Sequence, residues 1–257
     1  MSAYAILGAT GQTGGSILRL LGESPTNKVN VLVRSRSKLE KFYPPLSTNS
    51  NIKVFQGNIS DIPTLAQCLK GTKSAFLTVA VTDNIPGCSI SLDTAHAVIE
   101  ALQNLKAEDP AFKAPRLIVL SSASLDEKFW DGAPEFVHNI MYAANAYIYD
   151  DLKRAETYLR KHQDWLHVTF VMPGGLTHDV QQGHELSTER QQTFISFLDL
   201  GAGMIEVADA EGSRWDGGHV SVVLKDGRKA KFEWWAPVVL GKGLLCYLCP
   251  WLYGWLP

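Results

Sequence analysis

Residues 8–15 read GATGQTGG and follow directly on the apolar run AIL at residues 5–7. An apolar strand that runs into spaced glycines and then into a helical stretch is the sequence form of a dinucleotide-binding turn. Gly8 permits the tight turn off the strand, Gly11 lets the backbone approach a pyrophosphate, and Gly14 lets the helix pack closely on the strand. The spacing is G-x-x-G-x-x-G rather than the commoner G-x-G-x-x-G, so the prediction depends on the position directly after a first strand.

A helix that begins at this turn offers unpaired N–H groups and the positive end of its dipole to a phosphate. We therefore expect the turn to hold a dinucleotide. The predicted cofactor-binding residues of the turn are Gly8, Thr10, Gly11, Gln12, Thr13 and Gly14.

The composition is that of an ordinary globular protein. The 257 residues are 46% hydrophobic and 19% charged, with a formal net charge of −2, which gives no electrostatic case for nucleic-acid binding. Because the chain enters a strand at once, we expect no signal peptide. The four cysteines include a single CxxC at residues 246–249, which is a poor zinc site. We expect reduced thiols and a cytoplasmic location.

Six apolar runs, rich in β-branched residues and without polar alternation, have the pattern of parallel strands covered on both faces. These predicted strands are residues 3–7, 29–33, 52–55, 75–79, 117–120 and 168–172. Helical stretches lie between several of the strands, at residues 14–21, 62–69, 91–105 and 146–162. The alternation predicts an α/β fold with a doubly wound parallel sheet.

The pattern changes after MPGG at residues 172–175, so we divide the chain into a core of residues 1–176 and a C-terminal substrate lobe of residues 177–257. In the lobe, residues 177–189 read as a polar loop and residues 194–208 as a helix. Residues 219–224 and 229–232 suggest a hairpin that turns at Asp226-Gly227.

The tail at residues 233–257 is apolar and carries four tryptophans, but prolines and glycines interrupt it too often for a good membrane-spanning helix. We expect it to pack over the sheet edge or in a dimer contact. An interfacial membrane contact or a lid over a pocket is the alternative.

The second predicted strand ends in VRSRSK at residues 33–38. A carboxylate there would hydrogen-bond the free ribose 2′-hydroxyl of NAD, whereas Arg34, Arg36 and Lys38 can neutralise the 2′-phosphate of NADP(H). Because the guanidinium fork also matches a phosphate geometrically, we predict NADP(H) as the cofactor. Asn58 and Ile59 follow the third strand, where they would flank the adenine ring or form a plain strand-to-helix turn.

Tyr149 and Lys153 lie four residues apart in the predicted helix 146–162, so they share one helix face. An ammonium near a phenol, helped by an oxidised nicotinamide, lowers the tyrosine pKa. Such a tyrosine can exchange a proton with a carbonyl or alcohol oxygen during hydride transfer. Ser122 and Ser124 belong to LSSAS at residues 120–124, at a strand end that would line the ligand crevice, although serines there also cap helices or form turns.

These motifs resemble the atypical, NmrA-like short-chain dehydrogenases/reductases, close to the compact reductases of fungal natural-product pathways. The resemblance rests on GATGQTGG, VRSRSK, LSSAS, YDDLKRAE and VMPGG, and it spans about residues 3–176. It implies a Rossmann core, NADP(H), and a cofactor contact at Pro173 in the last of these motifs. Met172 departs from the family pattern, because many atypical members carry arginine there.

The resemblance also implies a Ser–Tyr–Lys catalytic set. Ser122, with Ser124 as the second choice, would orient the carbonyl of the substrate. Tyr149 would be the general acid, and Lys153 would bind the nicotinamide ribose and tune Tyr149.

We therefore predict an NADPH-dependent reductase of an apolar aromatic or polyketide-type small molecule in secondary metabolism. The tail and a set of aromatic residues would form apolar substrate walls. That set is Trp130, Phe136, Tyr142 and Tyr147. The loop that carries Asp126, Glu127, Trp130 and Asp131 would either add to the walls or be a surface loop.

Two alternatives keep the fold: an NADP(H)-sensing regulatory protein without turnover, and a non-redox isomerase or dehydratase. A homodimer is an open alternative to a monomer. No metal is expected, because His178, Asp179, His184 and Glu185 lie in a polar loop without helical pairing of the histidines.

Overall fold

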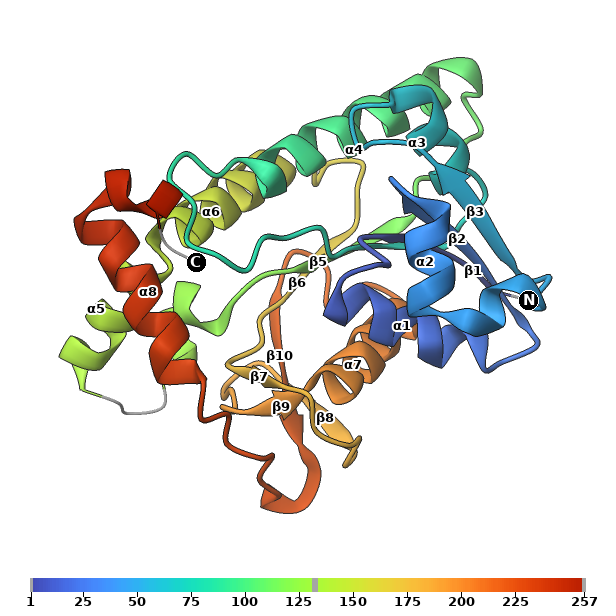
Figure 1. Ribbon diagram of the computed structural model, residues 1–257. Coiled ribbons are helices and arrows are strands. Elements are labelled where there is room, and N and C mark those ends of the chain that lie inside the picture. The colour runs from blue at the N-terminus through green and yellow to red at the C-terminus, as the bar shows by residue number, and fades with distance from the viewer. Residues whose placement is uncertain (1, 131–133, 256–257) are drawn as a thin grey trace.

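A central sheet with helices on both faces organises the molecule (Figure 1). The computed structural model describes residues 2–130 and 134–255. Within these ranges, eight strands form one sheet in the order β3-β2-β1-β4-β5-β6-β10-β8. The first six run parallel and are β1 (Ser2–Leu7), β2 (Asn27–Val33), β3 (Ile52–Gln56), β4 (Ser74–Leu77), β5 (Arg116–Leu120) and β6 (Val168–Val171). The predicted doubly wound parallel sheet of the Rossmann type is confirmed.

Helices cover both faces of this sheet. The α-helices of the described residues are α1 (Gln12–Gly22), α2 (Arg36–Phe42), α3 (Ile62–Leu69), α4 (Ile90–Glu108), α5 (Glu135–Ala144), α6 (Ala146–Arg160), α7 (Phe197–Asp209) and α8 (Ala236–Leu248). Of these, α5 and α8 pack against each other beside the sheet (Figure 1). On one face α1 and α7 pack together, and Ile6 of β1 joins an apolar cluster with Ile17 and Met204. On the other face α3, α4 and α6 pack over a second cluster, which contains Leu7 and Val98.

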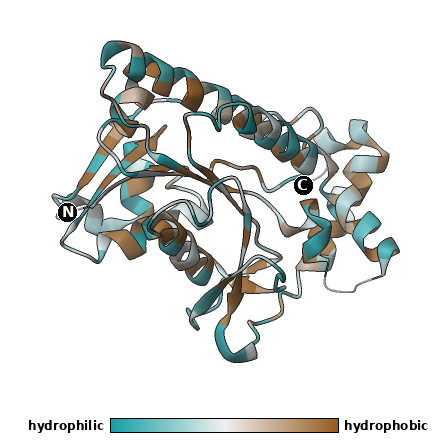
Figure 2. Ribbon diagram, turned by 180° about the vertical axis from the view of Figure 1, so that it is seen from behind, coloured by the Kyte–Doolittle hydropathy of each residue, from teal (hydrophilic) through white to brown (hydrophobic). Residues whose placement is uncertain are grey.

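Neighbouring strand residues such as Ile6 and Leu7 therefore point to opposite faces that are both buried. Two-sided burial explains why the strands read as unbroken apolar runs in the sequence. In Figure 2 the strands at the centre are mostly coloured as hydrophobic, whereas the helices carry both hydrophobic and hydrophilic residues.

The glycine-rich segment has the predicted strand–turn–helix form. Gly8 has a φ of +98°, which is in the region that favours glycine, and its carbonyl accepts a 2.9 Å hydrogen bond from the Gly11 amide. A Cβ on Gly14 would lie 2.4 Å from the carbonyl oxygen of Gly8 and 2.6 Å from the Thr78 hydroxyl. Only glycine at position 14 lets α1 approach the ends of β1 and β4 this closely.

The chain after residue 176 contributes to the main sheet as well as to the region beside it. β10 (His219–Leu224) lies parallel to β6 and antiparallel to β8 (His184–Ser187), while β7 (Leu176–Thr177) and β9 (Ile195–Ser196) form a separate pair. The predicted hairpin is therefore wrong, because β10 is held between β6 and β8 and residues 229–232 form no strand. The predicted loop at residues 177–189 contains β8, whose polar sequence HELS gave no strand signal.

The sequence also left three helices unassigned, namely α2, α5 and α8. α8 packs against α5, where a Cβ on Gly243 would lie 2.0 Å from the Ala144 carbonyl oxygen. Asn84, buried after β4, joins this pair to α6: its Nδ2 donates to the Gly243 carbonyl at 3.1 Å, and its Oδ1 accepts from the Tyr147 amide at 2.9 Å. Among the described residues, no helix is long and apolar enough to cross a membrane.

Gly14→Ala is expected to lower the free energy of unfolding by about 2 kcal/mol, because the added methyl group overlaps backbone that cannot move aside. The matched control is Gly241→Ala in α8, where nothing lies within 4 Å of the added Cβ. This control is expected to raise the free energy of unfolding by about 0.5–1 kcal/mol through helix propensity. Denaturant unfolding measures both changes, and equal effects of the two substitutions would contradict the packing argument.

Candidate active site

The first of two cavities at the carboxyl edge of the sheet lies over the ends of β1, β2, β3 and β4. We call it the glycine cleft, and its volume is about 350 Å³. The predicted cofactor-binding residues that line it are Gly8, Thr10, Gly11, Arg34, Lys38, Asn58 and Ile59. The cleft therefore brings together segments that the sequence analysis selected separately.

The remaining predicted cofactor-binding residues lie outside the lining of the glycine cleft. They are Gln12, Thr13, Gly14, Arg36, Pro173 and Lys153. Thr13 and Gly14 are buried where α1 packs on the sheet, and Gln12 lines a different cavity between α1 and α2. Arg36 lies along its own helix, where its Nε is 2.9 Å from Glu40 Oε1.

The lining of the glycine cleft fits a dinucleotide. Of its described lining residues, Arg34 and Lys38 are cationic and none is acidic. α1 has no acidic residue in its first turn, so the positive end of its dipole is not compensated by a carboxylate. Because a Cβ on Gly8 would lie 2.7 Å from the Thr78 carbonyl oxygen, bare backbone forms the floor, and a pyrophosphate can approach its N–H groups.

The second cavity, which we call the apolar pocket, lies beyond the end of β5 and has a volume of about 490 Å³. Its walls come from the segment after β5, from α5 and α6, from residues 191–194 and from the start of α8. Most of its lining is apolar or aromatic, including Phe129, Trp130, Val137, Met141, Phe194, Phe232, Trp235 and Leu240. A concave, mostly apolar cavity with a few polar groups is typical of a small-molecule site.

Three of the predicted catalytic residues, Ser122, Ser124 and Tyr149, line the apolar pocket. Tyr149 is almost completely buried, and its hydroxyl donates a hydrogen bond of 3.2 Å to Ser124 Oγ. Tyr149 is thus hydrogen-bonded to Ser124, the second of the two predicted serines, while Ser122 lines the same pocket. A buried phenol with a hydroxyl partner at a cavity wall is placed to exchange a proton with a bound molecule.

Lys153 is exposed and contacts a different tyrosine. Its Nζ donates to the Tyr142 hydroxyl at 3.1 Å and lies 4.7 Å from the centre of that ring. Tyr142 in turn donates to Asp150 at 2.8 Å, and its ring centre is 5.5 Å from that of Tyr149. Burial raises the pKa of the Tyr142 phenol above its ordinary value. The sequence analysis missed this contact because it assigned no helix to α5, which carries Tyr142.

The predicted aromatic walls agree with the structure in part. Trp130 lines the apolar pocket and stacks on His138, with 4.2 Å between the ring centres. Phe136 is 64% exposed and does not line the pocket, so its assignment as a wall is wrong. Tyr142 and Tyr147 are also absent from the lining, and Asp131 lies outside the described residues. Phe194, Phe232 and the start of α8 supply the missing walls.

Asp151, two residues after Tyr149, fixes the position of α6. Its side chain is fully buried and accepts hydrogen bonds from the amides of Ser91 and Leu92, at 2.7 and 3.1 Å. These amides belong to the N-terminal turn of α4, where a carboxylate is favoured by the helix dipole. Tyr149 therefore projects from a helix whose first half is tied to α4.

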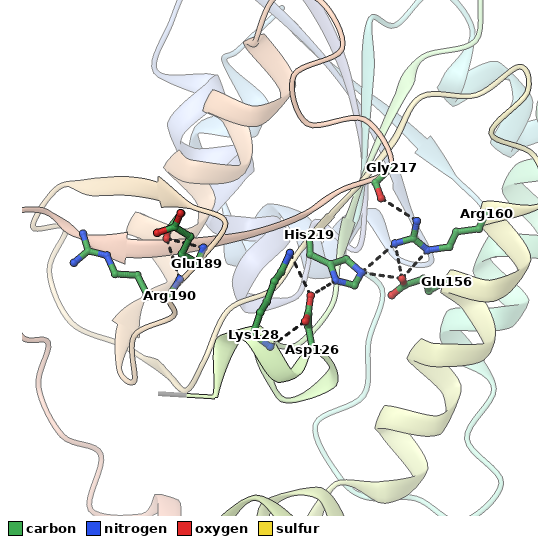
Figure 3. A network of polar contacts seen from close by, with 9 residues as sticks. Asp126, Lys128, Glu156, Arg160, Glu189, Arg190, Gly217 and His219 are labelled. Carbon is green, nitrogen blue, oxygen red and sulfur yellow. Dashed lines mark hydrogen bonds and ion pairs between the residues drawn. The ribbon is translucent and has the colours of Figure 1, made fainter. Parts of the chain in front are cut away.

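His219 of β10 bridges the serine segment and α6 (Figure 3). Its Nδ1 lies 2.5 Å from Asp126 Oδ2, and its Nε2 lies 2.8 Å from Glu156 Oε1. Burial alone would lower the pKa of His219, but the hydrogen bonds with Glu156 and Asp126 raise it above its ordinary value. The two carboxylates favour the protonated form of the ring, and their contacts with His219 tie together the two segments that carry Ser124 and Tyr149. Arg160 Nη2 also lies 3.1 Å from His219 Nε2.

The remaining candidates for metal or thiol chemistry do not form a site in the described part of the chain. No group of three or more His, Cys, Asp or Glu side chains that could hold a metal ion occurs among the described residues. His184 pairs with Glu206 at 2.9 Å. The four cysteines are free thiols, and burial raises the pKa of Cys68 to about 12.

The fold, the glycine cleft and the adjoining apolar pocket define the class of nicotinamide-dinucleotide oxidoreductases. A family model described as NAD(P)H-binding matches residues 8–211. The chain belongs to this NAD(P)H-binding family, which agrees with the resemblance of its motifs to the atypical, NmrA-like short-chain dehydrogenases/reductases.

Relatives of similar length are named oxidoreductases. The chain is 45% identical to oxidoreductase stcQ of Emericella nidulans over 260 residues, which cover 100% of this chain and 94% of that protein. It is 46% identical to oxidoreductase dmxR7 of a Cryptosporiopsis species, covering 87% of this chain and 94% of the relative. Oxidoreductase aflX of Aspergillus parasiticus is 42% identical, covering 98% of this chain and 94% of the relative.

Solved structures share the fold at low sequence identity. A short-chain dehydrogenase/reductase from Veillonella parvula in complex with NADP has a TM-score of 0.65 and 17% identity, covering 90% of this chain and 99% of that one. The oxidoreductase ylbE from Lactococcus lactis has a TM-score of 0.64 and 21% identity, covering 96% of each chain.

His219→Gln is expected to lower the free energy of unfolding by about 2 kcal/mol near pH 6, because the glutamine amide cannot reproduce the two charge-assisted hydrogen bonds. The pKa of His219 is raised in the folded protein above its value of about 6.5 in the unfolded chain. The stabilisation of the folded state by His219 is therefore complete below about pH 6.5, and it is lost as the pH rises through the folded-state pKa. The difference between the two proteins should therefore shrink at alkaline pH.

Denaturant unfolding at several pH values measures this difference. The matched control is His167→Gln, since His167 is 65% exposed and contacts a single carboxylate, that of Asp216. A destabilisation by His219→Gln that stays constant from pH 6 to alkaline pH would contradict the charged bridge.

Proposed function

We propose that the protein is an NADPH-dependent reductase that reduces a carbonyl group of an apolar aromatic or polyketide-type small molecule in secondary metabolism. One observation carries the proposal: the buried Tyr149 hydroxyl, hydrogen-bonded to Ser124, lines the apolar pocket at the same sheet edge as the glycine cleft. β4 is the neighbour of both β1 and β5, so the two cavities lie at the ends of adjacent strands.

The cofactor part of the proposal rests on the charge of the glycine cleft. Arg34 and Lys38 would bind the ribose 2′-phosphate, and the N-terminus of α1 would bind the pyrophosphate. When bound, the reduced nicotinamide supplies a hydride. The exposed Lys153 would bind the nicotinamide ribose, and Pro173 would lie against the cofactor beyond β6.

The chain itself supplies the proton and the orientation. Tyr149 Oη donates a proton to the carbonyl oxygen of the substrate, while Ser124 Oγ hydrogen-bonds that oxygen and orients the phenol. Ser122 lies on the same wall and offers a second hydroxyl. The aromatic walls exclude water and bind an apolar substrate, which favours an aromatic or polyketide-type molecule over a polar metabolite.

Tyr149→Phe is expected to lower kcat at least about 100-fold on an aromatic ketone that the wild type reduces, because the proton donor is removed. NADPH binding should stay unchanged. The matched control is Tyr142→Phe, since Tyr142 contacts Lys153 but does not line the apolar pocket. NADPH oxidation across a panel of aromatic ketones measures turnover, and calorimetry measures cofactor binding.

The same measurements separate the proposal from its alternatives. Equal turnover of wild type and Tyr149→Phe would contradict the role of Tyr149. Tight NADP⁺ binding without turnover of any carbonyl would identify a cofactor-sensing protein. With NADPH deuterated at C4, deuterium in the product is incompatible with a non-redox isomerase or dehydratase.

Arg34→Ala combined with Lys38→Ala is expected to raise the Kd for NADPH about 10- to 100-fold, which corresponds to the loss of one or two charge-assisted contacts. Binding of NADH, which lacks the 2′-phosphate, should change little. The control is Arg36→Ala, because Arg36 pairs with Glu40 outside the cleft. A parallel loss of NADPH and NADH affinity in the double variant would contradict selection of the 2′-phosphate.

A further inference from the structure

We propose that residues 225–255, the tail face, dock on the surface of a membrane that contains anionic phospholipids. The tail face consists of the loop at residues 225–235, α8 and the short helix η5 (Pro250–Trp255). In Figure 1, α8 and η5 lie at the edge of the molecule opposite to β2 and β3, and the orange-red loop at residues 225–235 lies at the bottom of the view. The inference concerns where the protein acts, and it does not depend on the proposed reaction.

Large apolar side chains are exposed along the whole tail face. The exposed fractions are 83% for Trp234, 73% for Val238, 64% for Leu248, 71% for Trp251 and 86% for Trp255. Soluble proteins rarely expose apolar side chains in such a continuous series, and an exposed apolar patch of this kind marks an interaction surface. The expected packing of the tail over the sheet edge would instead have buried these tryptophans.

One side of α8 is fixed to the protein, which leaves the opposite side for a partner. Gly243 meets the backbone of α5 at Ala144, and Cys246 is buried one turn further on. Val238, Leu245 and Leu248 project from the outward side and are exposed. Helical spacing places these three side chains in one stripe along the outward side of α8. A helix of this type lies flat on a membrane with its apolar stripe in the headgroup region.

The residue types favour a lipid surface over a protein partner. Tryptophans flank α8 at both ends, with Trp234 and Trp235 before it and Trp251 and Trp255 after it. Tryptophan is enriched at membrane–water interfaces, where its ring sits at headgroup level. From residue 234 onwards the sequence contains no Asp or Glu, so no acidic side chain would be carried into the headgroup region.

The charge of the loop at residues 225–235 complements an anionic lipid surface. Lys225, Arg228, Lys229 and Lys231 are all exposed within seven residues. Residues 225–257 contain five basic and two acidic residues, although the whole chain has a net charge of −2. The carboxylate of Glu233 accepts hydrogen bonds from the Thr177 hydroxyl and the His178 amide. Asp226, the other acidic residue, lies 3.6 Å from Arg228.

The tail face also adjoins the apolar pocket. Trp235, Pro237 and Val239 belong both to the tail face and to the lining of the pocket. Phe232 lines the pocket and makes an edge-to-face contact with the exposed Trp234. A membrane bound at the tail face would lie directly beside the pocket wall, so an apolar molecule dissolved in the bilayer would reach the pocket along an aromatic path.

The experiment is co-sedimentation of the full chain with vesicles of phosphatidylcholine, with and without phosphatidylserine. We expect the protein to sediment with the vesicles that contain phosphatidylserine and to remain in solution with phosphatidylcholine alone. Raising the salt concentration should release it, because the attraction of basic residues to the anionic surface is screened. Tryptophan fluorescence should shift to the blue on binding.

Lys225→Gln combined with Lys229→Gln should lower the partition coefficient about 30-fold, as expected for the loss of two basic residues near an anionic surface. The matched control is Lys28→Gln with Lys70→Gln, since both lysines are exposed and lie on β2 and after α3, away from the tail face. Trp251→Ser with Trp255→Ser should also lower binding, by about tenfold or more. Far-UV circular dichroism and NADPH binding establish that each variant is folded.

Three results would overturn the inference. One is the absence of sedimentation with vesicles that contain phosphatidylserine. Another is equal loss of binding in the control lysine variant. The third is a stable dimer in solution that dissociates in the Trp251→Ser, Trp255→Ser variant, because the tail face would then be an interface between two copies of the chain.

Discussion

The carboxyl edge of the sheet depends on one close approach, that of α1 to the ends of β1 and β4. A Cβ at Gly14 would lie 2.4 Å from the Gly8 carbonyl oxygen, and one at Gly8 would lie 2.7 Å from the Thr78 carbonyl oxygen. Because no side chain fits at either point, backbone alone forms the floor of the glycine cleft. The same approach brings the start of α1, directly after Gly11 of the cleft lining, to the edge of the cleft, where the positive end of the helix dipole favours a phosphate.

Two buried polar side chains position the apolar pocket relative to this cleft. Asp151 ties α6 to the N-terminus of α4, and Asn84 ties the segment after β4 to α5, α6 and α8. A buried carboxylate or amide costs free energy unless its hydrogen bonds are made, so each of these groups specifies one arrangement of the elements around it. Tyr149, which projects from α6, is thereby held at the pocket wall.

The sequence predicts an element correctly where the burial of that element leaves a clear pattern of apolar residues. β1, β4, β5 and β6 are buried on both faces along most of their length, which produces continuous apolar runs that a single sequence reveals. β8, with the sequence HELS, is only half-buried and gave no such signal, and the predicted partner of β10 was wrong for that reason. α5 and α8 bury only a few small residues, such as Ala144 and Gly243, and α8 is apolar around most of its circumference, so its helical periodicity is weak in the sequence.

The sequence by itself determined the turn at Gly8 to Gly14, the parallel sheet, the family and the basic end of β2, because each depends on neighbouring residues or on a short spacing. Only the tertiary structure decided that Tyr149 pairs with Ser124, that Lys153 contacts Tyr142, and that Arg36 lies outside the glycine cleft. It also decided that the start of α8 lines the apolar pocket while the tryptophans on either side of α8 are exposed. The physical reason is that local periodicity reports conformation and burial, whereas contacts between distant segments depend on how the helices pack around the sheet.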